Sequence, residues 1–326
     1  MSGGKVLELD ISQDTLDSLD PNEWYVDSYH VRGEKKYAEI RQRLYTPGKS
    51  GDLPYQPRPT QLNSDGFATV IVCSDHQAPY HDQKLHEAFC QYVEGAKPDI
   101  LVVLGDLIDF QPLSRFVDNP RMSTTVQSGI DSAYRILQDY RIAAPLATIH
   151  YLPGNHEERL QTMILSKVPS LTGVTKALQS KGFPAMSVQE LLRLSELDIH
   201  WEADRLGDWP QTQLHLSKFL TLTHGWLAKK NSGASALAMM EHLSRSVIVG
   251  HTHRQGIVFK TTHDTSGSIS VHTGVEVGTM CKVKGGLGYA VNPNWQNGFC
   301  TFTLYRDGRF STPQLVSYIN GRLYLP

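Results

Sequence analysis

The sequence predicts an α/β protein in which a second, largely antiparallel sheet packs on a parallel one. Three apolar runs rich in β-branched residues predict buried strands, at residues 67–73, 100–104 and 147–152. The amphipathic stretch 84–93 lies between the first two, and this order predicts parallel strands joined by right-handed crossovers. In the second half of the chain, short strands alternate with turns, which predicts the second sheet.

The strands expected in that second sheet are short and separated by turn residues. They are residues 199–203, 213–216, 219–223, 246–249, 256–260, 268–272, 299–305 and 314–318. Between the two groups of strands, residues 111–144 and 158–195 are mostly helical in pattern, with 128–140 the clearest helix. Breaks at Pro169 and Gly173 interrupt the second stretch. We expect these stretches to form a helical insertion or cap above the sheet edge.

The first 65 residues are polar and punctuated by proline and glycine, and we expect an N-terminal arm and linker there. Residues 34–44 predict one helix, because Ala38, Ile40 and Leu44 form a weak apolar stripe. Residues 46–48 and 54–59 predict an extended linker. The core is then expected to occupy residues 66–326.

Composition excludes several classes of protein. The 31 Lys and Arg residues against 33 Asp and Glu give a net charge of -2, so any contact with nucleic acid must use a local patch. The four cysteines are far apart and form no C-x-x-C pair, which predicts reduced, buried thiols rather than a zinc knuckle or a disulfide framework. No apolar run is long enough to span a membrane and no signal peptide is apparent, so we expect a soluble cytoplasmic protein.

Chemistry-bearing residues follow several strands at the point where each strand ends. Pro153-Gly154-Asn155-His156-Glu157 comes directly after the strand at 147–152, where open α/β sheets bind ligands. Gly154 is expected to supply the conformational freedom in φ that a sharp turn needs. Taken alone, this stretch is an ordinary turn.

The other strand ends supply acids and imidazoles. They are Asp75, Asp106, His224 and the pair His251 and His253. Residues two apart in an extended segment point the same way, so His251 and His253 can converge on one site. A mixture of carboxylate, amide and imidazole donors suits a pair of divalent metals of the Mn, Fe or Zn type.

Taken in order, these motifs resemble the calcineurin-like metallophosphoesterase superfamily over about residues 67–273. The sequence around them, including residues 294–299, is similar to metallophosphoesterases common in phages and bacteria. The resemblance implies a four-layer α-β-β-α sandwich of two mixed sheets with helices outside and a helical cap insertion. It also implies a metallophosphoesterase domain at 66–326 and, for a phage-encoded protein, a location in the host cytoplasm.

The resemblance implies a role for each motif residue. The implied ligands form two sets that share one bridging carboxylate: Asp75 and His253 for the first metal, Asn155, His224 and His251 for the second, and Asp106 for both. His156 would stand over the substrate as general acid or as a donor to the phosphoryl oxygen. Asp109 would orient His156, although an aspartate at that position is also a plausible helix N-cap.

Two positions depart from the family pattern. Where the first motif usually reads Asp-x-His, this chain has Gln77, and His76 beside it should point elsewhere. A glutamine carbonyl binds hard cations but is a poorer ligand for zinc or iron than imidazole. Either Gln77 is a weak ligand, or His81 replaces it, or the first metal binds loosely. We expect a looser first metal that favours Mn or Mg, with Zn or Fe as the other candidates.

The second departure bears on the substrate. Phe110 follows Asp109 where protein phosphatases of the superfamily continue with an arginine that binds phosphate, which disfavours a protein phosphatase. Arg159 and Arg254 directly adjoin motif residues and are the best candidates for binding phosphate. The aromatic residues that could stack on a base, or could instead belong to the core, are Tyr80, Phe110, Trp226 and Trp295.

Three functional hypotheses follow from these residues. The first is a two-metal phosphodiesterase acting on a nucleotide or nucleic acid, which includes nucleases. The second is a phosphomonoesterase, with protein phosphatases among them, and the third is a scaffold that keeps the fold without catalysis. None of them requires a membrane, and the oligomeric state is left open.

Overall fold

A computed structural model describes most of the chain. The described residues are 6–10, 24–32, 35–42, 66–114, 124–177, 183–203, 209–263, 265, 267–284, 287 and 292–325. The chain divides into two compact units, Met1–Pro54 and Tyr55–Pro326. The predicted linker at 46–48 and 54–59 lies outside the described residues.

The smaller unit contains a three-stranded antiparallel sheet with the order β1-β3-β2. Its strands are β1 (Val6–Asp10), β2 (Trp24–Arg32) and β3 (Lys35–Gln42). The single helix predicted at residues 34–44 is therefore wrong. Positions 38 and 40 of the predicted stripe also fit the two-residue period of a strand, and β3 gains backbone hydrogen bonds from a strand on each side.

The larger unit is built on a seven-stranded mixed sheet with the order β15-β14-β13-β4-β5-β6-β7. Four strands run parallel: β4 (Phe67–Cys73), β5 (Ile100–Leu104), β6 (Thr148–Leu152) and β7 (Ile199–Trp201). Three more complete it in antiparallel fashion: β13 (Gly298–Tyr305), β14 (Gln314–Ile319) and β15 (Arg322–Tyr324). The parallel arrangement predicted for the first three strands is confirmed.

The second sheet has five strands in the order β11-β12-β10-β9-β8. They are β8 (Leu214–His215), β9 (Leu220–Thr223), β10 (Ser246–Val249), β11 (Gln255–His263) and β12 (Ile269–Val277). Strand β10 pairs in parallel with both β9 and β12, whereas β8 and β11 pair antiparallel. The expectation of a largely antiparallel sheet is wrong, because helix α6 (Ala234–Leu243), which was not predicted, provides a crossover between β9 and β10.

Three strands expected in the second sheet belong to the first one instead. They are β7, β13 and β14. Sequence periodicity shows that a short apolar run is a strand but carries no sign of its partner, so sheet membership could not be derived from it.

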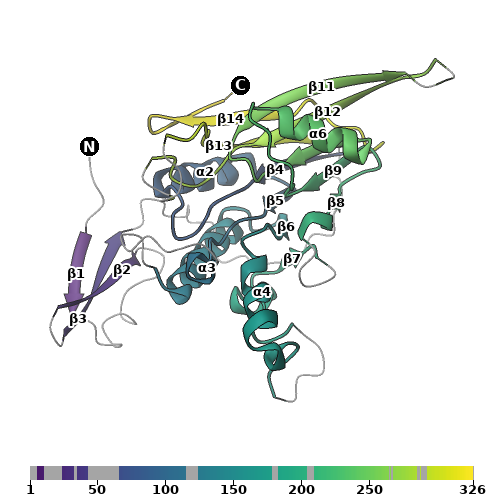
Figure 1. Cartoon of the computed structure of the whole chain (residues 1–326). Helices are drawn as coiled ribbons and strands as arrows, with labels where there is room; N and C mark the ends of the chain where they lie inside the picture. Colours follow the sequence, from purple (N-terminus) through teal and green to yellow (C-terminus); the bar gives the residue numbers. More distant parts are fainter. Residues whose placement is uncertain are drawn as a thin grey trace. The chain divides into compact units, whose positions relative to one another are not determined.

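The two sheets and their helices form four layers (Figure 1). Helices α2 (Gln83–Ala96) and α3 (Val126–Ala143) cover the seven-stranded sheet, and α6 covers the five-stranded sheet. Side chains alternate accordingly: Val70 and Val72 of β4 join the core shared by the two sheets. On the outer side of the second sheet, Val247 and Val249 pack against α6. The predicted α-β-β-α sandwich of two mixed sheets is confirmed.

The helix-rich stretches separate into different environments. Helix α3 packs beside α2 in the outer layer and is preceded by a short 3-10 turn, η1 (Gln111–Leu113). After β6 come α4 (Glu158–Lys167), η3 (Pro169–Leu171) and α5 (Val188–Leu191), and Figure 1 shows α4 extending away from the sheets. Helix α4 ends just before Pro169, as expected of a residue that cannot continue a helix. No helix of the described chain is long and apolar enough to cross a membrane.

The four cysteines are free and buried, as predicted from their spacing. They are Cys73, Cys90, Cys281 and Cys300. Burial raises the pKa of the Cys73 and Cys300 thiols far above the ordinary range, which keeps both in the neutral, unreactive form.

A buried carboxylate from strand β12 caps the start of helix α6. Glu276 of β12 accepts hydrogen bonds from the backbone N–H groups of Gly233, Ser235 and Ala236. The side chain of Gly233, the N-cap residue, cannot supply such an acceptor, so Glu276 satisfies the donors that the first turn leaves open.

We predict that Glu276→Gln lowers the free energy of unfolding by about 1.5–3 kcal/mol, because an amide replaces a charged acceptor. Urea denaturation followed by circular dichroism measures this loss. The matched control is Glu241→Gln on α6, whose exposed side chain pairs with Lys260 and is expected to contribute less than about 1 kcal/mol. Equal losses in both variants would contradict a capping role for Glu276.

Candidate metal centre

The carboxyl ends of strands from both sheets meet at one edge of the sandwich. Backbone hydrogen bonds join the loops there: Asp75 N donates to Gly105 O at 3.1 Å, and Gly250 N donates to His224 O at 3.0 Å. Parallel pairing aligns the strand ends within each sheet. The His251 N–H then donates to Asp75 Oδ2 at 2.9 Å and joins a loop of the five-stranded sheet to a loop of the seven-stranded sheet. This edge therefore collects the polar residues that follow β4, β5, β6, β9 and β10.

The residues implied for the second metal lie together. Ligand atoms of Asp106, His224 and His251 all lie within 4.8 Å of one another, which makes them a candidate metal-binding group. Asn155 Oδ1 lies 2.9 Å from His251 Nδ1 and 3.3 Å from His224 Nε2. His224 Nδ1 donates to the Leu104 carbonyl at 2.7 Å, which directs Nε2 toward the group.

The residues implied for the first metal adjoin this group. Asp75 Oδ1 lies 3.1 Å from His253 Nε2. The Gln77 amide nitrogen lies 3.1 Å from Asp106 Oδ2 and 3.5 Å from His253 Nε2. Asp106 Oδ2 is also 3.4 Å from His224 Nε2, so this one carboxylate touches both sets. The structure thus brings all seven predicted ligands into one cluster, which we call the ligand cluster.

The backbone around the ligand cluster is strained. Five predicted ligands have positive φ, among the twelve such non-glycine residues of the described chain: Asp75, Gln77, Asp106, His251 and His253. A left-handed conformation costs a non-glycine residue roughly 1–2 kcal/mol, so these loops hold their side chains in orientations that ordinary turns do not favour.

Two motif glycines permit a close approach between loops. A Cβ on Gly154 would overlap Asp106 Oδ1 and lie 2.6 Å from Asp106 N, and a Cβ on Gly250 would overlap the Ser74 hydroxyl. Gly154 does not have a positive φ, so the expectation that it supplies freedom in φ is wrong. It is required because the loop after β6 lies directly against the loop after β5.

The carboxylates and imidazoles of the ligand cluster shift each other's pKa. Burial alone would lower the pKa of His224 and His253, but the Asp106 and Asp75 carboxylates raise them to about 9 and about 10. Burial and the neighbouring His224 lower the pKa of His251 to about 4. The carboxylates therefore attract protons onto two imidazoles, at positions where a bound cation would balance the same charge.

Two further observations fit a cation. Gln77 Oε1 is buried and accepts no hydrogen bond from any described residue, and Asp75 Oδ1 is buried with His253 Nε2, itself a predicted ligand, at 3.1 Å. Such atoms are costly unless another partner satisfies them. The oxygen and nitrogen of an amide are assigned from hydrogen bonding alone, so a rotated Gln77 would present its oxygen to Asp106 and to a cation beside it.

Glu157 holds the loops of the ligand cluster together, a role that sequence analysis missed. Its carboxylate accepts from Asp106 N at 3.0 Å, Ile108 N at 3.2 Å, Gly154 N at 2.7 Å and the Tyr151 hydroxyl at 2.7 Å. It thereby ties the loop after β5 to the loop after β6. Burial, together with the nearby Asp106, raises the pKa of Glu157. The available signal in the sequence was an acidic residue, Glu157, within the motif at 153–157.

His156, Asp109 and Arg159 form a hydrogen-bonded group beside the ligand cluster. His156 Nδ1 lies 2.6 Å from Asp109 Oδ1, and His156 Nε2 lies 3.7 Å from Asp106 Oδ2. Arg159 Nη2 is 3.0 Å from His156 Nε2, and Arg159 Nη1 donates to Asp109 O at 2.6 Å. A guanidinium only donates, so Nε2 is the acceptor here and the imidazole proton resides on Nδ1.

Other predicted residues lie elsewhere. The Arg254 guanidinium donates to the Lys229 carbonyl and lies 3.9 Å from Glu276, so its phosphate-binding role stays a prediction with competing partners. His76 points away from the ligand cluster, as expected, with Nε2 2.6 Å from the Tyr140 hydroxyl. His81 Nε2 contacts Gln83 at 2.9 Å, and its ring lies beside His86, so the structure gives no support to His81 as a substitute ligand.

Two tryptophans flank the ligand cluster. The Trp209 ring centre lies 5.8 Å from that of His251 and 5.9 Å from that of His224. The Trp295 ring centre lies 4.3 Å from that of His253. Sequence analysis named Trp295 but not Trp209, which follows no motif and carries no local signal.

The remaining aromatic candidates have other partners. Trp226 packs against α6, and Phe110 is buried. The Tyr80 hydroxyl donates to Gln111 at 2.9 Å. None of these contacts involves a predicted metal ligand.

We predict that Glu157→Gln lowers the free energy of unfolding by about 3 kcal/mol or more, because an amide cannot accept all four hydrogen bonds. Chemical denaturation of the chelated protein measures this directly. Tyr151→Phe is the matched control, since it removes only one of the four donors and should cost about 1–2 kcal/mol. A Glu157→Gln variant as stable as Tyr151→Phe would show that the backbone contacts contribute little.

Comparison of the sequence with known proteins identifies a matching family model and two similar phage proteins. The family model described as calcineurin-like phosphoesterase matches residues 68–255. The chain is 28% identical over 270 residues to the gene 54 protein of Mycobacterium phage D29, covering 78% of this chain and 94% of that protein. It is 27% identical over 274 residues to the gene 54 protein of Mycobacterium phage L5, with the same coverage.

Solved structures of vacuolar protein sorting 29 are also similar. The protein from Cryptosporidium parvum has a TM-score of 0.40 and 12% identity, and covers 80% of this chain and 97% of its own. The protein from Chaetomium thermophilum has a TM-score of 0.33 and 11% identity, and covers 77% and 97%.

Proposed function

The chain belongs to the calcineurin-like phosphoesterase family, a family of metal-dependent phosphoester hydrolases, and we propose that it cleaves phosphodiesters of a nucleotide or nucleic acid. The observation that carries this proposal is the ligand cluster, in which one buried aspartate touches both sets of predicted ligands.

We infer that the ligand cluster holds two divalent cations. Asp75, Gln77 and His253 would hold the first, Asn155, His224 and His251 the second, and Asp106 both. The closeness of the Asp106, His224 and His251 ligand atoms and the buried Gln77 oxygen, which accepts no hydrogen bond from any described residue, support this assignment. Such a pair supplies Lewis acidity, acidifying a shared water and offsetting charge on the phosphoryl group. Because Gln77 offers an amide where imidazole is usual, Mn or Mg should be preferred at the first position.

His156 assists the leaving group in this proposal. Asp109 holds the proton on Nδ1, which fixes the ring so that Nε2 faces the ligand cluster. An imidazole protonated at both nitrogens would then deliver the Nε2 proton to the departing oxygen, while the Asp109 carboxylate stabilises the positive ring. Asp109 is thus a positioning residue rather than a helix cap.

Arg159 binds the phosphoryl group in this proposal. Its guanidinium occupies the position in front of His156 Nε2 and is partly exposed. An arriving phosphodiester offers anionic oxygens that compete for the same donors, because guanidinium–phosphate hydrogen bonds are charge-assisted. Movement of Arg159 onto the substrate would release Nε2 for proton transfer.

The two flanking tryptophans favour a nucleotide or nucleic-acid substrate. Trp209 lies on the side of the second ligand set and Trp295 on the side of the first. Indole rings beside a phosphate site are suited to stacking on the bases that a diester carries on both sides of its phosphorus. A phosphomonoesterase remains the alternative, since Arg159 would suit a terminal phosphate equally well.

We predict that the chelator-stripped protein hydrolyses bis-nitrophenyl phosphate only after Mn, Mg or Zn is added back. Asp106→Asn should abolish turnover, and His156→Ala should lower kcat by about 10²–10⁴-fold, because proton transfer is lost. Metal content by mass spectrometry should fall in Asp106→Asn and stay unchanged in His156→Ala, which separates the two roles.

Hydrolysis of mononitrophenyl phosphate, compared with that of bis-nitrophenyl phosphate, distinguishes a phosphomonoesterase from a phosphodiesterase. Faster hydrolysis of the monoester than of the diester would replace the diesterase proposal with a phosphomonoesterase. Absence of turnover with any metal, despite bound metal, would favour the non-catalytic scaffold.

We predict that Gln77→His tightens zinc binding at the first position by about tenfold or more, since imidazole is a better zinc ligand than an amide. Isothermal titration of the chelator-stripped protein gives the affinity and stoichiometry without relying on activity. His81→Gln is the control, because His81 lies outside the ligand cluster and its loss should leave zinc affinity unchanged. Equal zinc affinity for wild type and Gln77→His would exclude Gln77 from the ligands.

A further inference from the structure

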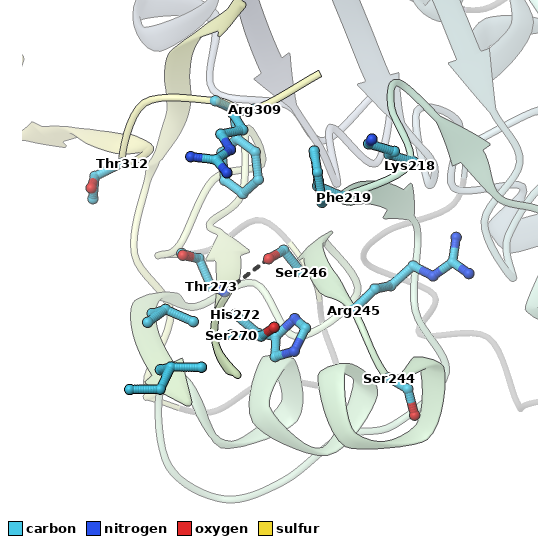
Figure 2. A pocket seen from close by; sticks show the side chains of 13 residues that line it. Lys218, Phe219, Ser244, Arg245, Ser246, Ser270, His272, Thr273, Arg309 and Thr312 are labelled. Atoms are coloured by element: carbon cyan, nitrogen blue, oxygen red, sulfur yellow. Dashed lines mark hydrogen bonds between the residues drawn. The ribbon is translucent and has the colours of Figure 1, made fainter. Parts of the chain in front are cut away.

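A second hollow lies at the edge of the five-stranded sheet opposite the ligand cluster (Figure 2). Its volume is about 480 Å³, which falls within the range of roughly 300–1,000 Å³ typical of ligand sites. Ser246, the first residue of β10, lines it, whereas His251 follows the last residue of the same strand. The two sites are therefore at opposite ends of β10.

Four chain segments far apart in sequence line this hollow. They are the turn before β9, the corner between α6 and β10, the first half of β12 and the connection from β13 to β14. Figure 2 shows Arg309 and Phe219 on one side, with Ser246, Thr273 and His272 on the other. The Thr273 N–H donates to the Ser246 hydroxyl at 3.0 Å, which joins β12 to β10 on this side of the hollow.

The lining is cationic. Lys218, Arg245 and Arg309 contribute permanent positive charges, and none of the lining residues is an aspartate or glutamate. This local excess contrasts with the net charge of -2 for the whole chain. A positive hollow without acids attracts anions and disfavours cations.

The three cations have few competing partners. Arg245 forms no ion pair with any acid of the described chain. The Lys218 ammonium lies over the Phe219 ring, 4.9 Å from its centre, in a cation–π contact that is weak at an exposed site and that a phosphate and a base can displace. Arg309 pairs with Asp307 at 3.6 Å, but these side chains are 77% and 61% exposed, so water screens the pair. All three are therefore available to an anionic ligand.

Apolar surface lies directly beside these charges. Phe219 is 38% exposed, Ile269 64% and Val271 62%, which is unusual for large apolar side chains. The Phe310 ring lines the same hollow. Phosphate needs cations and hydroxyls, whereas a base needs a flat apolar face, and this hollow offers both within one volume.

We propose that this hollow binds a segment of single-stranded nucleic acid. Lys218, Arg245 and Arg309 contact the phosphates, and Phe219 stacks on a base. An acidic peptide would use the same cations but would gain nothing from an aromatic platform beside them. The proposal does not require catalysis, because the hollow and the ligand cluster lie at opposite ends of the sheet.

The test is fluorescence anisotropy of a labelled oligothymidylate with the full chain in a chelator, where no turnover occurs. The double variant Arg245→Glu/Arg309→Glu should lower affinity by about tenfold or more and reduce the dependence of binding on salt. Phe219→Ala keeps the charge and should lower affinity by about fivefold or more through lost stacking.

The matched control is Lys84→Glu/Arg322→Glu, which changes the net charge equally at exposed positions outside the hollow. It should keep affinity within about twofold of wild type, because no phosphate contact is removed. Far-UV circular dichroism and the thermal unfolding midpoint of each variant report on folding without relying on activity.

Two outcomes would overturn the proposal. One is an equal loss of affinity in the hollow variant and the control, which indicates attraction by overall charge. The other is undiminished binding by Phe219→Ala together with equally tight binding of a polyglutamate peptide, which indicates a general anion surface. A failure of the esterase proposal would leave these binding data unaffected, so the two inferences fail separately.

Discussion

The buried carboxylate of Asp106 is the constraint around which the metal centre is arranged. It accepts from His156 N at 2.9 Å, contacts Gln77 and His224, and has its pKa held well below the usual range, in spite of burial, by the nearby His156 and His224. Glu157 lies behind it as a second buried acid. Two anions this close are tolerated only with backbone donors on one side and positive charge on the other.

That arrangement separates the roles of the two acids. Glu157 has its hydrogen-bonding capacity met by three backbone N–H groups and a tyrosine, so it belongs to the framework. Among the described residues, Asp106 accepts from one backbone N–H, that of His156, and its other oxygen faces the side chains of Gln77 and His224. The strain in φ at five predicted ligands indicates that the framework, rather than local preference, sets these orientations.

The parts of the structure that sequence could predict are those with a local signal. The strands at β4, β5 and β6 are continuous apolar runs, and the predicted ligands follow strands in short motifs, so both could be derived from neighbouring residues. Other features depend on residues far away in sequence, and no local pattern encodes them. They are the pairing partner of each strand, the crossover through α6 and the position of Trp209 beside the ligand cluster. Gly154 is a further example. A side chain at this position would collide with Asp106 in another loop, and nothing in the sequence around Gly154 indicates that contact.

The five-stranded sheet separates two sites of different electrostatic character. At the carboxyl ends of β9 and β10, His224 and His253 lie beside Asp106 and Asp75 of the other sheet, and these carboxylates and imidazoles largely balance each other in charge. At the opposite ends Lys218, Arg245 and Arg309 attract a phosphodiester whether or not metal is bound. If the two proposals above hold, a nucleic acid bound at the cationic hollow would stay at high local concentration near the ligand cluster, where the metals would act on its phosphate. Because the hollow and the ligand cluster lie at opposite ends of β10, a chain with a net charge of -2 can present a cationic surface well away from its carboxylate and imidazole groups.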